Sequence, residues 1–150
     1  MGVIEGDVSS SVDAEVLGKE DVPPVLQINT GGTCHLDANM LSDALSNLPL
    51  SDIELLLIEN VGNLICPAGF ALGEHKKVLV SSAPEGNDKP FKYPSMFYRA
   101  DAVLINKVDL IPYLKFSTQS FFQTVRRINE KVKIHPISCT TGQGIQEWIS

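Results

Sequence analysis

The sequence has no long apolar run, and no segment approaches the roughly 20 apolar residues that a membrane-spanning helix needs. Positive charge is also scarce: 12 Lys and Arg residues stand against 18 Asp and Glu residues, and the net charge is −6. This balance argues against a nucleic-acid-binding protein, which needs a basic face, and weakly against adhesion to an anionic membrane. We therefore expect neither nucleic acid nor membrane as a partner.

Cysteine is rare as well. Only Cys34, Cys66 and Cys139 are present, and they form no C-x-x-C pair. The first residues lack the basic and long apolar stretches of a secretory signal peptide. We therefore expect a cytoplasmic protein with reduced thiols that are available to bind metal. The phosphate-binding pattern G-x-x-x-x-G-K-S/T is also absent from the 150 residues.

What the sequence does contain is an alternation of short apolar runs and stretches of helical spacing. Its length suits one domain, with 43% apolar and 20% charged residues. The expected strands are residues 25–28, 53–58, 78–80, 102–105 and 132–137, and the expected helices are 36–45, 121–128 and one that begins at 145. This order predicts an α/β fold, a mostly parallel sheet with helices on both faces.

Three segments carry more particular expectations. About 24 residues at the start are polar and predict loops around a short helix near residues 14–17. The unbroken apolar run 55–58 predicts a strand that is buried on both faces. Residues 83–96, rich in proline and charge, predict a long connection that is either functional or merely solvated.

Asn106-Lys107-Val108-Asp109 follows an expected strand and matches the guanine-specificity motif N-K-x-D. The Asp109 carboxylate can accept hydrogen bonds from the ring N–H and the exocyclic amino group of guanine, whereas adenine has no such ring N–H. The stem of Lys107 can lie along the base, and Asn106 can tie neighbouring loops together. The alternative is an ordinary loop in which Asp109 caps a helix.

Ser138 and Cys139 follow the next expected strand and begin a turn that ends at Gly142. G-proteins place backbone N–H groups against the guanine carbonyl oxygen at this point, and such a contact needs a tight turn. Turns of this composition are common, so the segment supports the guanine motif without establishing it.

A further strand is followed by Glu59-Asn60-Val61-Gly62. A carboxylate at Glu59 can serve Mg²⁺, which prefers oxygen ligands, and Gly62 can bring its N–H close to a γ-phosphate. Asp7 and Asp13 are further carboxylates that could serve magnesium. The alternative for both aspartates is a helix cap or a plain surface position.

Cys34 and His35 stand at the start of an expected helix, and Cys66 follows the loop after Glu59. All three belong to the same edge of the expected sheet, and two thiolates with an imidazole suit nickel or zinc. Three ligands leave a coordination position open for metal transfer, or let a symmetric dimer share the ion. The spacing matches no known zinc module, so a buried Cys66 and a helix-start His35 are the alternative.

These segments resemble the HypB proteins, the hydrogenase maturation GTPases of the CobW/HypB/UreG group within the SIMIBI class of P-loop GTPases. The most specific segments are residues 34–38 (Cys-His-Leu-Asp-Ala) and 59–63 (Glu-Asn-Val-Gly-Asn). Weaker similarity extends over 4–7, 13–14, 27–31, 57–67, 85–94, 106–110 and 138–142. The sequence departs from the pattern at Gly32-Thr33, where many relatives have a lysine followed by a small or polar residue.

The resemblance implies a GTP-binding metallochaperone that hydrolyses GTP, dimerises with GTP bound and delivers nickel during maturation of nickel–iron hydrogenase. The implied cofactors are GTP, Mg²⁺ and Ni²⁺ or Zn²⁺. The implied partners are a second copy of the chain, a nickel-chaperone partner and the hydrogenase large-subunit precursor. The implied site residues are Cys34, His35 and Cys66 for nickel or zinc, Glu59 as the catalytic residue, Gly62, Asp7 and Asp13 for phosphate and magnesium, and Asn106, Lys107, Asp109, Ser138 and Cys139 for guanine.

We therefore expect residues 1–150 to form one SIMIBI-type G-domain that lacks its first strand and phosphate loop and stops within a helix. Such a chain is expected not to hydrolyse GTP by itself. Two alternatives stay open: a non-catalytic nickel- or zinc-binding dimerisation module, and a sister metallochaperone for urease or cobalamin enzymes. The Cys34-His35 pair argues against the sister metallochaperone.

Overall fold

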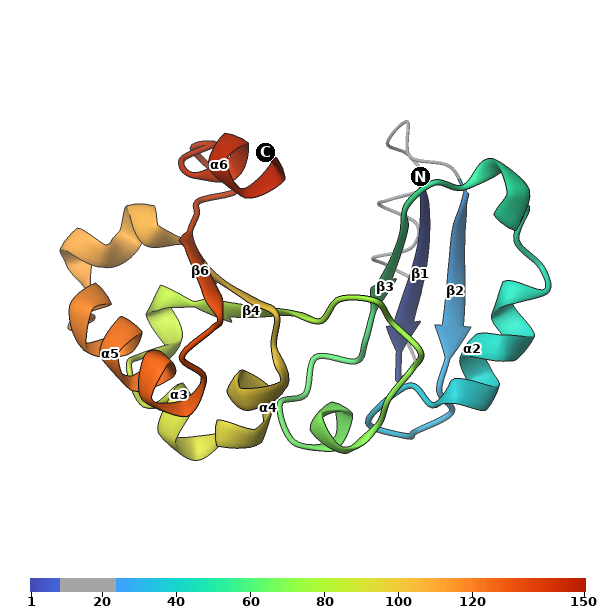
Figure 1. Ribbon diagram of the computed structural model, residues 1–150, viewed down its shortest axis with the longest axis horizontal. Helices are drawn as coiled ribbons and strands as arrows, with labels where there is room; N and C mark the ends of the chain where they lie inside the picture. The colour runs from blue at the N-terminus through green and yellow to red at the C-terminus, as the bar shows by residue number, and fades with distance from the viewer. Residues whose placement is uncertain (9–23) are drawn as a thin grey trace. The chain divides into compact units, whose positions relative to one another are not determined.

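The computed structural model describes residues 1–8 and 24–150. They divide into two compact units, Met1–Gly73 and Glu74–Ser150, which Figure 1 draws with their helices and strands. Each unit contains a three-stranded parallel sheet, so the α/β class and the parallel strands predicted from the sequence are confirmed. Among the described residues, no helix has the length and apolar character to cross a lipid bilayer.

In the first unit, β1 (Gly2–Asp7) is the central strand, with β2 (Val25–Asn29) on one side and β3 (Leu56–Glu59) on the other. The prediction of loops before residue 24 was therefore wrong for β1. Two glycines and two carboxylates give this segment little of the composition of a strand, but pairing on both edges stabilises it. The helix expected near residues 14–17 lies outside the described residues.

One face of this sheet is covered by α2 (Ala38–Leu45). Leu41 and Ala44 of the helix pack on Ile4 of β1, and partly buried apolar side chains of β2, β3 and the following loops surround them. Asp37 caps the helix, because its Oδ1 accepts hydrogen bonds from the second and third backbone N–H groups that follow it, at 2.8 and 2.9 Å. The predicted helix is thus present, two residues shorter at its start.

The run of residues 55–58 is not buried on both faces. Leu55 is 54% exposed and Leu57 47% exposed, and burial alternates along β3. The reason is that β3 is an edge strand in its own three-stranded sheet.

In the second unit, β5 (Ala102–Asn106) lies between β4 (Val78–Ser82) and β6 (Lys133–Pro136). The first four residues of β5 are all buried, as expected for a central parallel strand that is covered on both faces. α5 (Thr118–Ile128) contributes Phe121 to this core.

The proline-rich segment 83–96 is a series of short helices rather than a long connection. It contains a 3₁₀ helix (Ala83–Glu85), α3 (Lys89–Lys92) and the start of α4 (Pro94–Arg99). Each of these elements has a proline in its first turn, where the missing N–H and the restricted φ of proline suit a helix start. The prolines therefore mark helix beginnings. α6 (Ile145–Ile149) is the last helix, as predicted.

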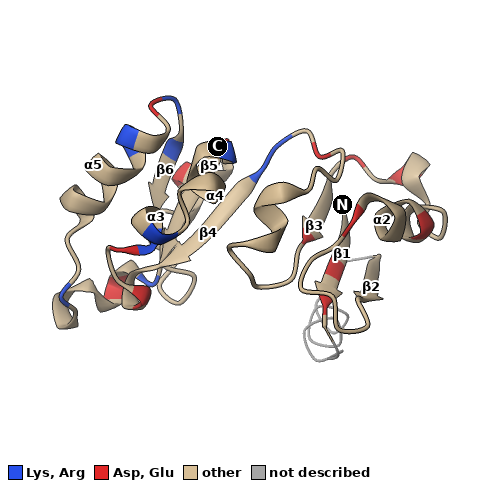
Figure 2. Cartoon of the chain, turned by 90° about the horizontal axis from the view of Figure 1, so that it is seen from below, with Lys and Arg blue, Asp and Glu red and all other residues tan. Residues whose placement is uncertain are grey.

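Charge divides unevenly between the units. Lys19 is the only Lys or Arg before Lys76, whereas acidic residues occur throughout the sequence. Figure 2 accordingly shows blue only in the second unit and red on β1 and β3 of the first. The first unit therefore has a negative electrostatic potential, which favours the approach of cations.

Candidate functional site

Three potential metal ligands meet at one edge of the first unit. Cys34 and His35 lie in the loop between β2 and α2, and Cys66 begins a 3₁₀ helix (Cys66–Gly69) after β3. The two Sγ atoms are 2.7 Å apart, and the Cys34 Sγ is 3.8 Å from the His35 Nδ1. All three ligand atoms lie within 4.8 Å of one another. The structure thus brings together the three residues predicted to bind metal.

The chemistry of this cluster suits a soft or borderline divalent ion. Both cysteines are free thiols, and all three side chains are half-buried, so the cluster is reachable from solvent. The hydrogen bond with the Cys66 thiol, followed by burial, raises the pKa of Cys34. Metal binding must displace thiol protons, because the thiolate is the ligand. Cys139 is exposed and belongs to the other unit.

Two asparagines and an aromatic ring support the metal ligands. The Asn60 Oδ1 accepts a hydrogen bond from the backbone N–H of Leu36 at 2.9 Å, and the Asn63 Nδ2 donates to the Cys34 carbonyl oxygen at 3.4 Å. The His35 ring stacks on Phe70, with centroids 3.9 Å apart. These contacts were not predicted from the sequence. The only available signal was that both asparagines fall in the 59–63 segment.

The two described carboxylates that were predicted to serve magnesium lie at the ends of strands in the first unit. β1 ends at Asp7 and β3 ends at Glu59, and parallel strands bring these ends to one edge. Glu59 pairs in register with Glu5, two residues before Asp7, so Glu59 and Asp7 share one face of the sheet. Among the described residues, and apart from the two chain neighbours of Gly62, no atom lies within 4 Å of the position that a Cβ on Gly62 would occupy, so its backbone is open to close approach. Asp13 lies outside the described residues.

The predicted guanine motif forms a structured loop in the second unit. Asn106 is the last residue of β5, and its Oδ1 accepts hydrogen bonds from the N–H groups of Lys107 at 2.7 Å and Cys139 at 3.2 Å. The structure thus confirms the expectation that Asn106 ties neighbouring loops together. Ser138 is fully buried, and its Oγ accepts from the N–H of Thr141 at 3.2 Å.

Asp109 has the feature expected of a residue that binds a base. Its Oδ1 is buried, and within the described part of the chain no hydrogen-bond partner reaches it. A buried carboxylate oxygen without a donor costs about 1–3 kcal/mol. The two N–H groups on one edge of guanine would satisfy such a carboxylate, so the residues present fit the base. The helix-capping alternative is not supported, since Asp109 itself lies inside a 3₁₀ helix (Val108–Tyr113).

Tight backbone geometry shapes both sides of this loop. Lys107 adopts a left-handed conformation with φ 60°. A Cβ on Gly144 would lie 2.1 Å from the carbonyl oxygen of Pro136. The segment that follows the 138–142 turn can therefore approach β6 closely only because residue 144 is glycine.

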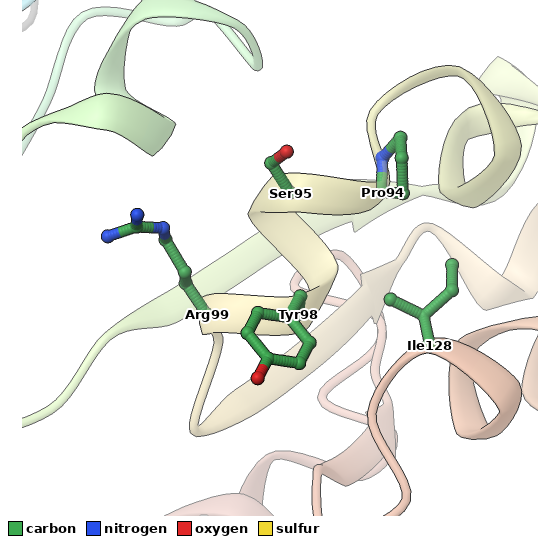
Figure 3. A pocket seen from close by; sticks show the side chains of 5 residues that line it. All are labelled: Pro94, Ser95, Tyr98, Arg99 and Ile128. Carbon is green, nitrogen blue, oxygen red and sulfur yellow. The ribbon is translucent and has the colours of Figure 1, made fainter.

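A shallow cavity of about 360 Å³ occurs elsewhere in the second unit. Figure 3 shows its lining, which comes from α4 and the end of α5: Pro94, Ser95, Tyr98, Arg99 and Ile128. None of the predicted site residues lines it. The candidate site is therefore defined by the loops that follow the strands and not by this cavity.

Comparison with known proteins agrees with these motifs. Residues 1–136 match the family described as CobW/HypB/UreG, nucleotide-binding domain. The chain is 49% identical over 148 residues to the hydrogenase maturation factor HypB of Escherichia coli K12, covering 99% of this chain and 51% of that protein. It thus spans about half the length of this protein and of HypB from Azotobacter chroococcum, to which it is 47% identical over 150 residues.

Two solved structures are similar over nearly the whole chain. A crystal structure of HypB from Archaeoglobus fulgidus has a TM-score of 0.89 and 41% identity, covering 99% of this chain and 71% of that one. A crystal structure of HypB from Helicobacter pylori in complex with nickel has a TM-score of 0.93 and 36% identity, covering 97% of this chain and 69% of that one.

Proposed function

The chain belongs to the CobW/HypB/UreG family of nucleotide-binding domains, and we propose on this basis that it is the metal-holding part of a GTP-dependent nickel chaperone for nickel–iron hydrogenase maturation. The observation that carries the proposal is the convergence of Cys34, His35 and Cys66, whose ligand atoms lie within 4.8 Å of one another. Nickel is the cargo in this proposal. The nickel-bound relative from Helicobacter pylori supports nickel as the ion of interest.

The ligand set favours transfer over permanent storage. A structural zinc site normally has four protein ligands, whereas this cluster offers three half-buried ones. An open position can accept a ligand from a donor or recipient protein, or from a second copy of the chain around a two-fold axis. The acidic character of the first unit increases the local concentration of cations. We propose that the chain binds nickel reversibly and forms a homodimer that shares the ion.

Metal titration tests this proposal directly. The measurements are nickel and zinc binding under reducing, anaerobic conditions, with the oligomeric state followed by light scattering. Variants are the double substitution Cys34→Ala, Cys66→Ala and the matched control Cys139→Ala, which removes an exposed thiol from the other unit. We expect the double variant to lose binding and the control to retain it. Equal binding by all three chains, or none by any, would leave the cluster as packing residues.

Guanine recognition at Asp109 is the second part of the proposal. The Asp109 carboxylate, whose Oδ1 is buried, can accept hydrogen bonds from two N–H donors of a guanine base. We therefore expect the chain to bind guanosine nucleotides in preference to adenosine nucleotides. In Asp109→Asn, the amide would donate to a C2 carbonyl, so the preference should move from guanine to xanthine. Equilibrium dialysis with GDP, ADP and XDP measures both, and Asp88→Asn serves as the exposed control. An unchanged GDP preference in Asp109→Asn would exclude this role.

Magnesium is proposed at the edge formed by Glu59 and Asp7, with Glu59 as the catalytic residue. Hydrolysis of GTP is proposed for the protein in which this domain operates, because phosphate binding in P-loop GTPases depends on the G-x-x-x-x-G-K-S/T loop, which these 150 residues do not contain. A second candidate function is a metal-binding dimerisation module without catalysis, which the cluster of Cys34, His35 and Cys66 supports by itself. Phosphate release from GTP by the chain, at or above the rate of a P-loop-containing relative, would exclude it.

A further inference from the structure

The metal ligands come from two separate loops that no covalent bond joins. Cys34 and Cys66 are 32 residues apart in the sequence, and both are free thiols. Without an ion, the ligand side chains are joined only by a thiol–thiol hydrogen bond and a thiol–imidazole contact, both of which are weak, and thiol burial is only partial here. The backbone of the two loops must therefore be held in place by other groups.

Asn60 fixes the first loop to the sheet. It directly follows the last residue of β3, and its Oδ1 accepts hydrogen bonds from the N–H groups of Leu36 and Val61, both at 2.9 Å. Leu36 is the residue after His35, and it is fully buried. Its side chain lies against β1 at Gly6, where a Cβ would come within 2.7 Å of it. The Leu36 segment thus has one anchor through its side chain and another through Asn60.

Asn63 connects the two ligand loops to each other. Its Oδ1 accepts a hydrogen bond from the N–H of Ile65 at 2.8 Å, and Ile65 directly precedes Cys66. Its Nδ2 donates to the carbonyl oxygen of Cys34 at 3.4 Å, which is a long and weaker contact. One side chain therefore touches the backbone beside each thiol ligand.

We propose that Asn60 and Asn63 are positioning residues of the metal centre, which hold the Cys34–Leu36 backbone against the loop that leads to Cys66. The proposal rests on the proposed function, because it assigns a role in metal binding to residues that touch no ion. Without these contacts, metal binding has to order both loops, and this entropic cost lowers the affinity. Asn60 makes the shorter bonds and carries the larger share of the effect.

The two asparagines differ in what they contribute, and conservative variants separate them. Asn60 acts only as an acceptor in these contacts, so Asn60→Asp retains the oxygen whereas Asn60→Ala removes it. Asn63 acts as both donor and acceptor, so Asn63→Asp keeps the bond from Ile65 and loses the bond to Cys34. Asn47→Ala is the control, because the Asn47 side chain also makes a hydrogen bond with the backbone, donating to the carbonyl oxygen of Asp43 outside the ligand loops.

The test measures nickel affinity and the absorption spectrum of the Co²⁺-loaded 150-residue chain, in which thiolate-to-cobalt bands report thiolate coordination. We expect Asn60→Ala to weaken nickel binding about tenfold, as the loss of one net hydrogen bond implies, and to reduce the thiolate bands at equal cobalt. Asn60→Asp should restore both, and Asn47→Ala should match the parent. A purely structural role would lower the unfolding midpoint but leave the affinity and spectrum of the folded chain unchanged. That result would overturn the proposal.

A second measurement needs no nickel or cobalt. An arsenical that reacts with paired thiols should link Cys34 and Cys66 in the parent, and reaction should be slower in Asn60→Ala than in Asn47→Ala, as followed by mass spectrometry. Equal rates in the two variants would also overturn the positioning role. If the parent pairs its thiols but binds no nickel, the proposed function fails while the positioning of the loops stands. If the parent binds nickel and Asn60→Ala binds it equally well, only the positioning role fails.

Discussion

Lys107 provides a test of whether the guanine loop is held in a strained conformation. Its φ of 60° and ψ of 38° lie in the left-handed region, and no other non-glycine residue in the described part of the chain has a positive φ. A side chain there costs about 1–2 kcal/mol, whereas glycine ordinarily costs about 0.5–1 kcal/mol relative to alanine. Lys107→Gly should therefore give a more stable chain than Lys107→Ala, by about 0.5–1 kcal/mol.

Lys115 supplies the control, because it is an exposed lysine of the same unit whose φ is not positive. At this position the order should reverse, with Lys115→Gly less stable than Lys115→Ala by about 0.4–1 kcal/mol. The comparison of glycine with alanine at each site cancels the loss of the lysine side chain. The sign of the difference, rather than its size, is what distinguishes the two positions.

The assay is urea unfolding, monitored by the fluorescence of Trp148, the only tryptophan. Its ring centroid is 5.1 Å from that of His135 within the second unit, so the fluorescence reports on that unit. Linear extrapolation gives the free energy of unfolding, and an unchanged slope shows that the unfolded states are comparable. If Lys107→Ala is as stable as Lys107→Gly, the left-handed turn carries no strain. The inference that the guanine loop is held in a strained conformation at Lys107 would then be refuted.

Three further substitutions have expected outcomes. Asp37→Ala should lower the stability of the first unit by about 1 kcal/mol, because it removes the cap of α2; unchanged unfolding by circular dichroism would contradict this. Asn129→Ala should lower the free energy of unfolding by about 2 kcal/mol, since the Asn129 Nδ2 donates to three carbonyl oxygens at the end of α4. Asn129→Asp lacks the donor and should be no more stable than Asn129→Ala in urea unfolding followed by Trp148 fluorescence. Hydrogen bonds from the Lys76 side chain and the Lys77 backbone N–H lower the pKa of Asp101. The ionised Asp101 carboxylate therefore stabilises the folded chain above its ordinary pKa, and this contribution is lost as pH falls below about 4. Asp101→Asn should flatten the acid limb of a stability–pH curve, and an unaltered limb would exclude the contribution.

Much of the fold was predictable because its elements have strong local patterns. The helical spacing before residue 45 and the buried run of β5 predicted their elements to within two residues. β1 was missed because Gly2, Glu5, Gly6 and Asp7 make it look like a loop, and only its two neighbouring strands stabilise it. The exposure of Leu57 could not be predicted either, since the position of a strand within its sheet is not a local property.

The candidate site, like the fold, was predictable only in part. The guanine motif was recognisable because its residues are adjacent in sequence, and the metal triad was left open because the spacing of Cys34, His35 and Cys66 matches no known module. The supporting contacts of Asn60, Asn63 and Phe70 were not predictable. They are single contacts to residues between 24 and 35 positions away, and such contacts leave no periodic pattern in a sequence.

Each unit contains an asparagine at or directly after the end of a strand, and the two asparagines accept similar pairs of backbone hydrogen bonds. Asn60 directly follows β3 and accepts the N–H of the next residue together with that of Leu36, 24 residues away. Asn106 ends β5 and accepts the N–H of the next residue together with that of Cys139, 33 residues away. Each asparagine keeps its strand-end turn closed and joins it to a second loop. The loops joined by Asn60 carry the predicted metal ligands, and those joined by Asn106 carry the predicted guanine contacts. In both units, an asparagine at the carboxyl end of a parallel strand therefore marks where two loops with predicted ligand residues meet, even when those residues themselves show no pattern.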